Sequence, residues 1–262
     1  MRIQNVAAAY FSPTFRTEKI VTWIGKAWKD QVEWIDLIKR KKHPIQYTCS
    51  GNDLLVIGVP VYGGRVPAVV QERIQCLHGN QTPVLLVVTY GSRAYEDALL
   101  ELKTMMVARG FVPVGGAAVV TEHSIIKKIA AGRPDKEDQK MILGFVKKLK
   151  KRLEELQAIS QVGDLRVPGN RNYREYNGIP LKPKAGKNCN GCGLCARKCP
   201  VGAISRKNPK QMREDLCISC MRCVEICPKK GRSISKIKLF AAGQKLKKQC
   251  QTDRKNEFFL FS

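Results

Sequence analysis

The sequence has few acidic residues, few histidines and no long hydrophobic run. Of its 262 residues, 22 are Asp or Glu and 47 are Lys or Arg, so the formal net charge is +25. The three histidines, His43, His78 and His123, are far apart and have no metal-binding spacing. Because no apolar stretch approaches the roughly 18 residues of a membrane-spanning helix, we expect none in this chain.

Signatures of several enzyme classes are also missing. The sequence contains no Walker loop, no recognisable Ser–His–Asp arrangement and no C-x3-C-x2-C run, which radical S-adenosylmethionine enzymes carry. The opening residues, MRIQNVAAAYF, lack the basic and then apolar pattern of a secretory leader. We therefore expect a cytoplasmic protein, in a compartment where disulfide bonds are rare.

Cysteine, by contrast, is abundant and regularly spaced. Eight of the eleven cysteines form two matching runs of the form C-x-x-C-x-x-C-x-x-x-C-P. This is the bacterial spacing for two 4Fe–4S clusters, in which the fourth cysteine of each run ligates the other cluster. The spacing predicts that one cluster is held by Cys189, Cys192, Cys195 and Cys227. It predicts that the other is held by Cys217, Cys220, Cys223 and Cys199.

Zinc and disulfide bonds are the two alternative roles for these cysteines. A structural zinc ion needs only four ligands, whereas each run supplies a third closely spaced cysteine and the run occurs twice. A disulfide framework would need an oxidising compartment. The remaining cysteines, Cys49, Cys76 and Cys250, have no ligand spacing, so we expect inert thiols there.

The segment from Lys187 to Ile234 resembles the bacterial two-cluster ferredoxins, and the resemblance implies a small α+β domain. Its two halves, Cys189–Ser205 and Cys217–Ser235, look like an internal repeat in which the second copy has extra residues after its proline. Such a short segment contains little apolar surface, so we expect the clusters to hold it together.

The first part of the chain alternates between predicted strands and helices, which indicates an α/β domain with a parallel sheet. Continuous apolar runs such as LLVIGVP and VLLVVTY are typical of strands buried on both faces. The predicted strands are Ile3–Phe11, Val32–Leu37, Leu54–Pro60, Val84–Tyr90 and Phe111–Thr121. Apolar residues at helical spacing predict the helices Thr17–Lys29, Ala94–Arg109 and Lys136–Leu156.

Three loops follow these strands at the edge where an open α/β sheet binds ligands. The first strand leads into Ser12–Thr17, a hydroxyl-rich turn that opens a helix and so offers hydroxyl and N–H groups to a phosphate. The third strand leads into Pro60–Gly64 and the fourth into Thr89–Glu96. These two loops are expected to place two aromatic residues, Tyr62 and Tyr95, near one rim.

With these loops in this order, residues 1–159 resemble a flavodoxin, which has a doubly wound fold with a parallel five-stranded sheet and binds FMN. The resemblance implies that four residues hold the FMN phosphate: Ser12, Thr14, Arg16 and Thr17. It implies that the other two loops surround the flavin ring through Pro60, Val61, Tyr62, Gly63, Gly64, Thr89, Tyr90, Gly91, Ser92 and Tyr95.

One residue of the first loop departs from the flavodoxin pattern. Flavodoxins have glycine where this chain has Phe15, and glycine permits a positive φ and a close backbone approach. Either Arg16 compensates by pairing with the phosphate, or the domain keeps the fold without the flavin.

The sequence therefore divides into four parts. Residues 1–160 are the flavodoxin-like domain, 161–186 a linker, 187–236 the ferredoxin domain and 237–262 a basic C-terminal tail. In the linker, Tyr173 and Tyr176 are candidates for pinning the chain against a domain. The tail ends in the apolar residues FFLF, and we expect it to pack against a domain surface.

As a whole, the chain resembles the flavodoxin–ferredoxin fusion proteins of anaerobes, which implies an intracellular carrier of low-potential electrons with two 4Fe–4S clusters and FMN. Its positive charge favours an acidic redox protein or oxidoreductase as partner. The scattered basic residues show no nucleic-acid recognition motif and no membrane-binding helix. Two alternatives stay open: a flavin-dependent reductase that uses the clusters as an internal wire, and a flavin-free domain that docks the ferredoxin part to a partner.

Overall fold

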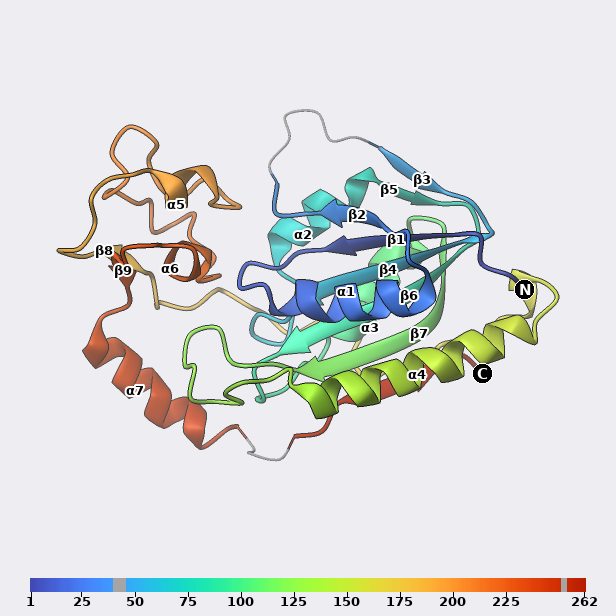
Figure 1. The fold of residues 1–262 in the computed structure, drawn as a ribbon. Helices are drawn as coiled ribbons and strands as arrows, with labels where there is room; N and C mark the ends of the chain where they lie inside the picture. The colour runs from blue at the N-terminus through green and yellow to red at the C-terminus, as the bar shows by residue number, and fades with distance from the viewer. Residues whose placement is uncertain (40–45, 251–253) are drawn as a thin grey trace.

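The computed structural model describes residues 1–39, 46–250 and 254–262 (Figure 1). His43 therefore lies outside the described residues. The core of the molecule is a six-stranded sheet in the order β10-β7-β6-β4-β1-β2. Its strands are β1 (Asn5–Tyr10), β2 (Glu33–Asp36), β4 (Asp53–Pro60), β6 (Thr82–Tyr90), β7 (Phe111–Val120) and β10 (Glu257–Leu260).

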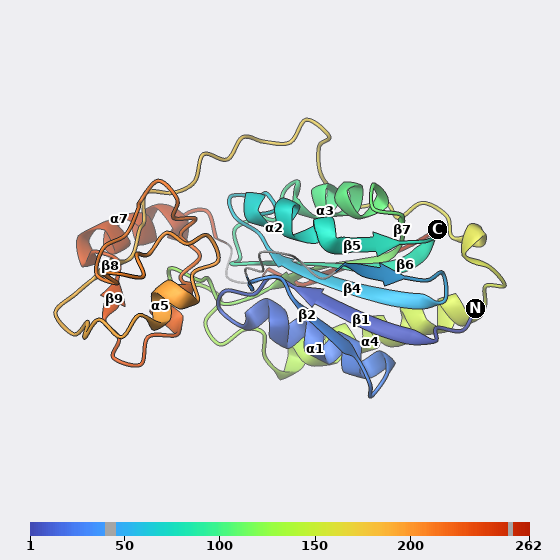
Figure 2. The same ribbon diagram turned by 90° about the horizontal axis from the view of Figure 1, so that it is seen from above.

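The first five strands of this sheet in chain order pair in parallel, and every residue of β6 is buried. Helices cover both faces, as Figure 2 shows, with α1 and α4 on one side and α2 and α3 on the other. The bounds of these helices are α1 (Arg16–Trp28), α2 (Ala68–Arg73), α3 (Ala98–Val107) and α4 (Lys136–Glu154). The predicted parallel strands and the three predicted helices are thus present, each within a few residues of its expected bounds.

Two separate hydrophobic cores result from this layering, one on each face of the sheet. Ile20 and Ile24 of α1 and Phe145 of α4 belong to the core on one face. Leu99 and Leu102 of α3 belong to the core on the other. A small parallel pair, β3 (Tyr47–Cys49) with β5 (Leu77–Gly79), and the short 3-10 helices Ile74–Cys76 and Ile159–Gln161 complete the described part of this domain.

The sheet has one more strand than the sequence predicted, and the C-terminal tail supplies it. After the helix α7 (Lys236–Lys247), β10 pairs antiparallel with β7 from Gly115 to Ala118. Phe258 stacks on Phe145 of α4 with a centroid distance of 4.9 Å, and Phe261 is buried. The tail therefore packs against the first domain as expected. Its antiparallel pairing was not predicted, because an apolar run of four residues does not specify a partner strand.

The cysteine-rich segment folds into a small module built from α5 (Leu194–Arg197), α6 (Arg222–Glu225) and the antiparallel pair β8 (Lys184–Ala185) and β9 (Arg232–Ser233). Figure 1 shows this module beyond the carboxyl ends of the parallel strands. The chain enters it through the linker and leaves it through α7, so the module is tied to the first domain at both ends.

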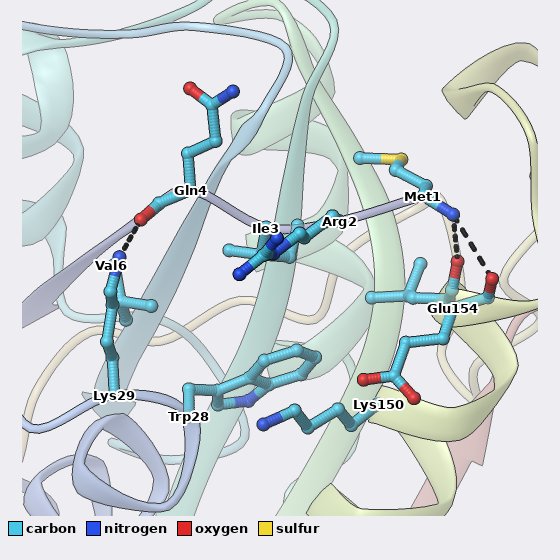
Figure 3. A pocket seen from close by; sticks show the side chains of 10 residues that line it. Met1, Arg2, Ile3, Gln4, Val6, Trp28, Lys29, Lys150 and Glu154 are labelled. Carbon is cyan, nitrogen blue, oxygen red and sulfur yellow. Dashed lines mark hydrogen bonds between the residues drawn. The ribbon is translucent and has the colours of Figure 1, made fainter.

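A separate cavity lies at the opposite, amino end of the sheet (Figure 3). The N-terminal amine donates hydrogen bonds to backbone carbonyl groups at the end of α4, including that of Leu153 at 3.0 Å. Three basic side chains, Arg2, Lys29 and Lys150, line this cavity. It is formed by residues far from the predicted loops and cysteines. Among the described residues, no helix is long and apolar enough to cross a membrane.

Candidate iron–sulfur centres and the loops beside them

The eight regularly spaced cysteines surround two small cavities of about 20 Å³ each. The first cavity is lined by Cys189, Cys192, Cys195 and Cys227. The second cavity is lined by Cys199, Cys217, Cys220 and Cys223. Each run of the sequence thus sends its fourth cysteine to the other cavity. In the part of the chain that the structure describes, no group of three or more His, Cys, Asp or Glu side chains is arranged to hold a single metal ion.

The internal repeat is visible in the backbone as well as in the spacing. In each copy, a left-handed residue precedes the short helix, Gly193 before α5 and Met221 before α6. The first copy has φ values of 75°, 74° and 68° at its left-handed glycines Gly191, Gly193 and Gly202. The matching positions of the second copy, Ser219, Met221 and Lys230, have φ values of 54°, 60° and 47°. The second copy therefore adopts the same turns without glycine.

Replacing Lys230 with glycine should stabilise the ferredoxin module by about 0.5–1 kcal/mol, because a left-handed backbone costs a side chain with a Cβ roughly 1–2 kcal/mol. The matched control is Lys229→Gly, since Lys229 is also exposed but has no positive φ. That control should destabilise the module slightly. The measurement is the temperature at which the anaerobic protein loses its cluster absorbance, and equal shifts in both variants would contradict this account.

The first cavity contains a buried positive charge. Arg232 is only 2% exposed, and its Nε donates a hydrogen bond to Cys195 Sγ at 3.3 Å. Beside it, the backbone N–H of Gly231 donates to Cys227 Sγ at 3.1 Å. Donors that point at sulfur stabilise thiolates and tune the reduction potential of a cluster. This polar environment fits a group that carries negative charge on sulfur.

Burial opposes thiolate formation in the second cavity. It raises the pKa of Cys223 to about 12, although Arg232 partly offsets the effect, and it raises the pKa of Cys220 as well. These two buried thiols have no reason to ionise on their own. Bound iron would supply the missing stabilisation, because a coordinating thiol is deprotonated outright. The donor set and its surroundings therefore fit 4Fe–4S clusters.

The two cavities face in different directions. At the first, Cys192 is exposed. The second faces the α/β domain, where Ile218 packs against the hydrophobic core and Arg73 Nη2 donates to the carbonyl of Pro200 at 3.1 Å. Burial raises the pKa of Tyr62, and the nearby Cys220 thiol raises it further. One cysteine-lined cavity is thus at an outer surface, and the other is at the domain interface.

Two hydroxyl groups of the predicted phosphate loop, those of Ser12 and Thr17, already have partners within the protein. Ser12 Oγ accepts a hydrogen bond at 3.0 Å from the backbone N–H of Glu18, in the first turn of α1. Thr17 Oγ1 lies 2.7 Å from Thr89 Oγ1, and both residues are buried. Arg16 donates to the carbonyl of Thr14 at 2.9 Å. The side chains of Ser12, Arg16 and Thr17 are therefore engaged with their own domain, as is the carbonyl of Thr14.

Phe15 occupies the glycine position in the conformation that glycine would adopt, with φ 65°. Its ring is 43% exposed, and the guanidinium group of Arg222 lies 4.5 Å from the ring centroid. Arg222 comes from the start of α6 and also donates to the carbonyl groups of Ser12 and Pro13 at 3.3 and 3.2 Å. The ferredoxin module therefore contacts the phosphate loop through Arg222.

The prediction that Tyr95 lies at the rim beside Tyr62 needs correction. Tyr95 is 6% exposed, and its hydroxyl donates to Glu257 of β10 at 2.8 Å. Its ring packs edge-on against Tyr90 at a centroid distance of 5.3 Å. The ring points inward because the unpredicted sixth strand provides a half-buried acceptor, Glu257, for its hydroxyl group. Tyr95 therefore does not offer an aromatic face to a flat ligand.

The glycines of the two ring loops are covered by side chains of the same protein. Tyr176 of the linker lies against Gly63, Glu96 against Gly64 and His123 against Gly91. Of the other predicted ring residues, Pro60 ends β4, the N–H of Val61 donates to the Thr89 carbonyl at 2.8 Å, and Ser92 is buried. As folded, these loops do not fit FMN.

His123 should make the stability of the first domain depend on pH. Burial and the charge of Arg93 lower its pKa to about 4, and its Nδ1 accepts from the N–H groups of Ile125 and Ile126. Between pH 6.5 and 4 the unfolded chain binds a proton that the folded chain does not. Stability should therefore fall by about 1 kcal/mol per pH unit as the pH drops below 6.5.

Urea unfolding at pH 7.5 and pH 5.5 measures this effect, followed by tryptophan fluorescence because all three tryptophans lie before Asp36. In the variant His123→Gln the pH dependence over this interval should be largely lost. If the free energy of unfolding of the variant depended on pH as in the wild type, a group other than His123 would be responsible for that dependence.

The parallel strand order β2-β1-β4-β6-β7 is the flavodoxin-like order 2-1-3-4-5 of doubly wound folds. The chain is thus a fusion of a flavodoxin-like domain with an iron–sulfur ferredoxin domain. A family model described as a 4Fe-4S dicluster domain matches residues 188–232. An uncharacterized ferredoxin from Methanocaldococcus jannaschii is 41% identical over 59 residues, which is 21% of this chain and 38% of that relative. The chain thus spans well under half of that relative's length.

Solved flavodoxin structures resemble the first domain. A flavodoxin from the domain Archaea aligns with 58% of this chain and 100% of its own, at 10% identity and a TM-score of 0.42. Flavodoxin 2 from Bacillus cereus aligns with 57% of this chain and 99% of its own, at 16% identity and a TM-score of 0.42. The strand order, rather than these likenesses, identifies the fold.

Several residues at this interface could not be recognised in the sequence. Arg222 and Arg232 are ordinary basic residues among many, and nothing in their spacing marks them as contacts of a loop or a thiol. The linker tyrosines did carry a signal, since aromatic residues in a segment rich in Gly and Pro are candidates for anchors. Tyr173 packs under Arg65 at 4.9 Å, and Tyr176 lies against Gly63.

Proposed function

We propose that this protein is an electron carrier that holds two 4Fe–4S clusters, one in each cysteine-lined cavity. The observation that carries the proposal is the sorting of eight cysteines into two sets of four, with the fourth cysteine of each run exchanged. When bound, each cluster would supply one-electron chemistry, and the protein would supply burial, orientation and hydrogen bonds to sulfur. FMN is not part of the proposal, because the loops as folded do not fit it.

The outer site is where electrons would be exchanged with a partner. Cys192 is exposed there, and the basic residues Arg197, Lys198, Lys229 and Lys230 are exposed nearby in sequence. A basic rim favours encounter with an acidic redox protein. Reduction of the clusters by the dithionite anion should therefore slow as ionic strength rises, whereas reduction by a cationic viologen radical should not.

Metal and sulfide analysis of one anaerobically purified sample tests the proposal. About eight iron and eight acid-labile sulfide per chain would support it, as expected for two cubane clusters. About four of each would support only one cluster. Zinc without sulfide would overturn the assignment.

A flavin-free docking role for the first domain is the second candidate, and the contacts of Tyr176 and Arg222 with the predicted flavin loops favour it. The two roles are compatible, since a docked ferredoxin module can still carry electrons. Turnover assays with a defined donor and acceptor distinguish a carrier from a reductase that has its own substrate.

A further inference from the structure

All three loops that a flavodoxin would use for its cofactor contact the ferredoxin module or the segments that connect it. The phosphate loop contacts Arg222 of α6. The second loop contacts Tyr176 of the linker through Gly63. The third loop contacts β10, where Tyr95 donates to Glu257. It also contacts the linker, where Glu96 pairs with Arg174. All of these contacts therefore lie at the edge of the sheet where a flavodoxin binds its cofactor.

Charge at the phosphate loop is already balanced without a phosphate. Arg16, the one basic residue of the loop, pairs with Glu122 and lies 3.7 Å from Glu225 of α6. Glu225 also pairs with Lys127 at 2.9 Å. The ion pairs of Arg16 would have to break before a phosphate dianion could pair with it. Two further cations, Arg222 and Lys127, lie at the same site, so the obstacle is the existing pairs and not a lack of positive charge.

Space at the ring position is filled as well. Tyr176 lies against Gly63, and Arg174 and Glu96 lie against Gly64, so a linker segment covers both glycines. The backbone N–H groups of Asn170 and Arg174 donate to the buried carboxylate of Asp97, each at 2.8 Å, which fixes this segment on the first domain. The strap is defined here as residues 170–176. It is hydrogen-bonded to the domain, and its position does not depend on a single side chain.

The second cysteine-lined cavity lies beside this strap. The thiols of Cys217 and Cys220 line that cavity, and both lie near the hydroxyl of Tyr62, as does Tyr176. Ile218, between these cysteines, packs against the core of the first domain. The edge that would receive a flavin in a flavodoxin thus receives a cysteine motif of the same chain.

We propose that the cofactor edge of the flavodoxin-like domain is a docking surface for the second cysteine motif, and that the strap and Arg222 take the places of the flavin ring and phosphate. The chain accordingly does not take up FMN. The shielding part of this inference rests on the proposed cluster in the second cavity, whereas the flavin part does not. The domain then acts as a shield that keeps solvent and oxygen from the inner cluster while the outer cluster stays accessible.

The first test is flavin content and FMN titration of the full-length protein. After anaerobic purification, acid extraction should release no flavin, and FMN fluorescence should not be quenched at concentrations up to about 100 μM, a range that covers ordinary cofactor affinities. Stoichiometric flavin, or saturable quenching, would overturn the inference. Iron and sulfide are measured on the same sample, so a failure of the cluster assignment is distinguished from a failure of this one.

The second test compares two linker variants. Tyr176→Ala removes the ring that lies against Gly63, whereas Tyr173→Ala removes a ring of the same linker that packs on Arg65 and Thr104. Loss of the inner cluster in air, followed by electron paramagnetic resonance, should be about tenfold faster in Tyr176→Ala, because removing a half-buried aromatic ring eases local opening. Tyr173→Ala should behave like wild type. Equal rates in both variants and in wild type would overturn the shielding role.

Discussion

Replacing Cys199 with alanine should abolish the inner cluster and leave the outer cluster intact, although Cys199 belongs to the first run of the sequence. The reason is that Cys199 lines the second cavity with Cys217, Cys220 and Cys223. Loss of one thiolate leaves one iron of a cubane without its protein ligand. The expected result is the loss of one of two cluster signals and of up to about half of the iron.

The comparison that identifies the missing cluster uses two further variants. Cys220→Ala removes a ligand of the inner site and Cys192→Ala one of the outer site. The paramagnetic spectrum of reduced Cys199→Ala should match that of Cys220→Ala. A match to Cys192→Ala would mean that each run holds its own cluster. Cys250→Ala is the control, since Cys250 lines neither cavity and should change neither spectrum.

Replacing Asn256 with alanine should destabilise the first domain by about 3 kcal/mol, because it leaves several buried polar groups without partners. Asn256 Oδ1 accepts from the N–H of Val120 at 2.9 Å, and its Nδ2 donates to Asp138 at 2.7 Å. Burial alone would raise the pKa of Asp138, but hydrogen bonds from Arg133 and from Asn256 lower it. The Asn256 side chain therefore joins the segment that leads into β10 to both β7 and α4.

Urea unfolding followed by tryptophan fluorescence measures this loss. The matched control is Asn5→Ala, because Asn5 also donates to an aspartate, Asp53, but does so at an exposed site. That change should cost about 0.5 kcal/mol or less. In Asn256→Ala the C-terminal residues should also become susceptible to protease. A variant as stable as the control would show that β10 is held by its backbone pairing and by Phe258 alone.

Local patterns in the sequence were sufficient for the parallel sheet and for the cysteine sets. Buried strands such as Asp53–Pro60 have continuous apolar runs, and cysteine spacing constrains cluster ligation directly. Position along the chain was also enough to place the three loops at one edge, because the carboxyl ends of parallel strands meet there.

Contacts between distant segments were not predictable in the same way. The inward turn of Tyr95 depends on Glu257, which the sequence places in a short apolar tail with no visible partner. The contact with the phosphate loop depends on Arg222. In the sequence this residue lies between Cys220 and Cys223, where only the cysteines had a predicted role. At the phosphate loop, Phe15 was a local signal, since a bulky residue at a glycine position indicated that this loop differs from that of a flavodoxin.

The antiparallel strand β10 has a consequence for the order of synthesis. The sheet cannot gain its sixth strand until Glu257–Leu260 leave the ribosome, and by then both cysteine runs have already been translated. The module is therefore complete in sequence before the last strand pairs with β7. Because both ends of the module are then anchored, replacement of a lost cluster would require the module to open while its tethers remain attached.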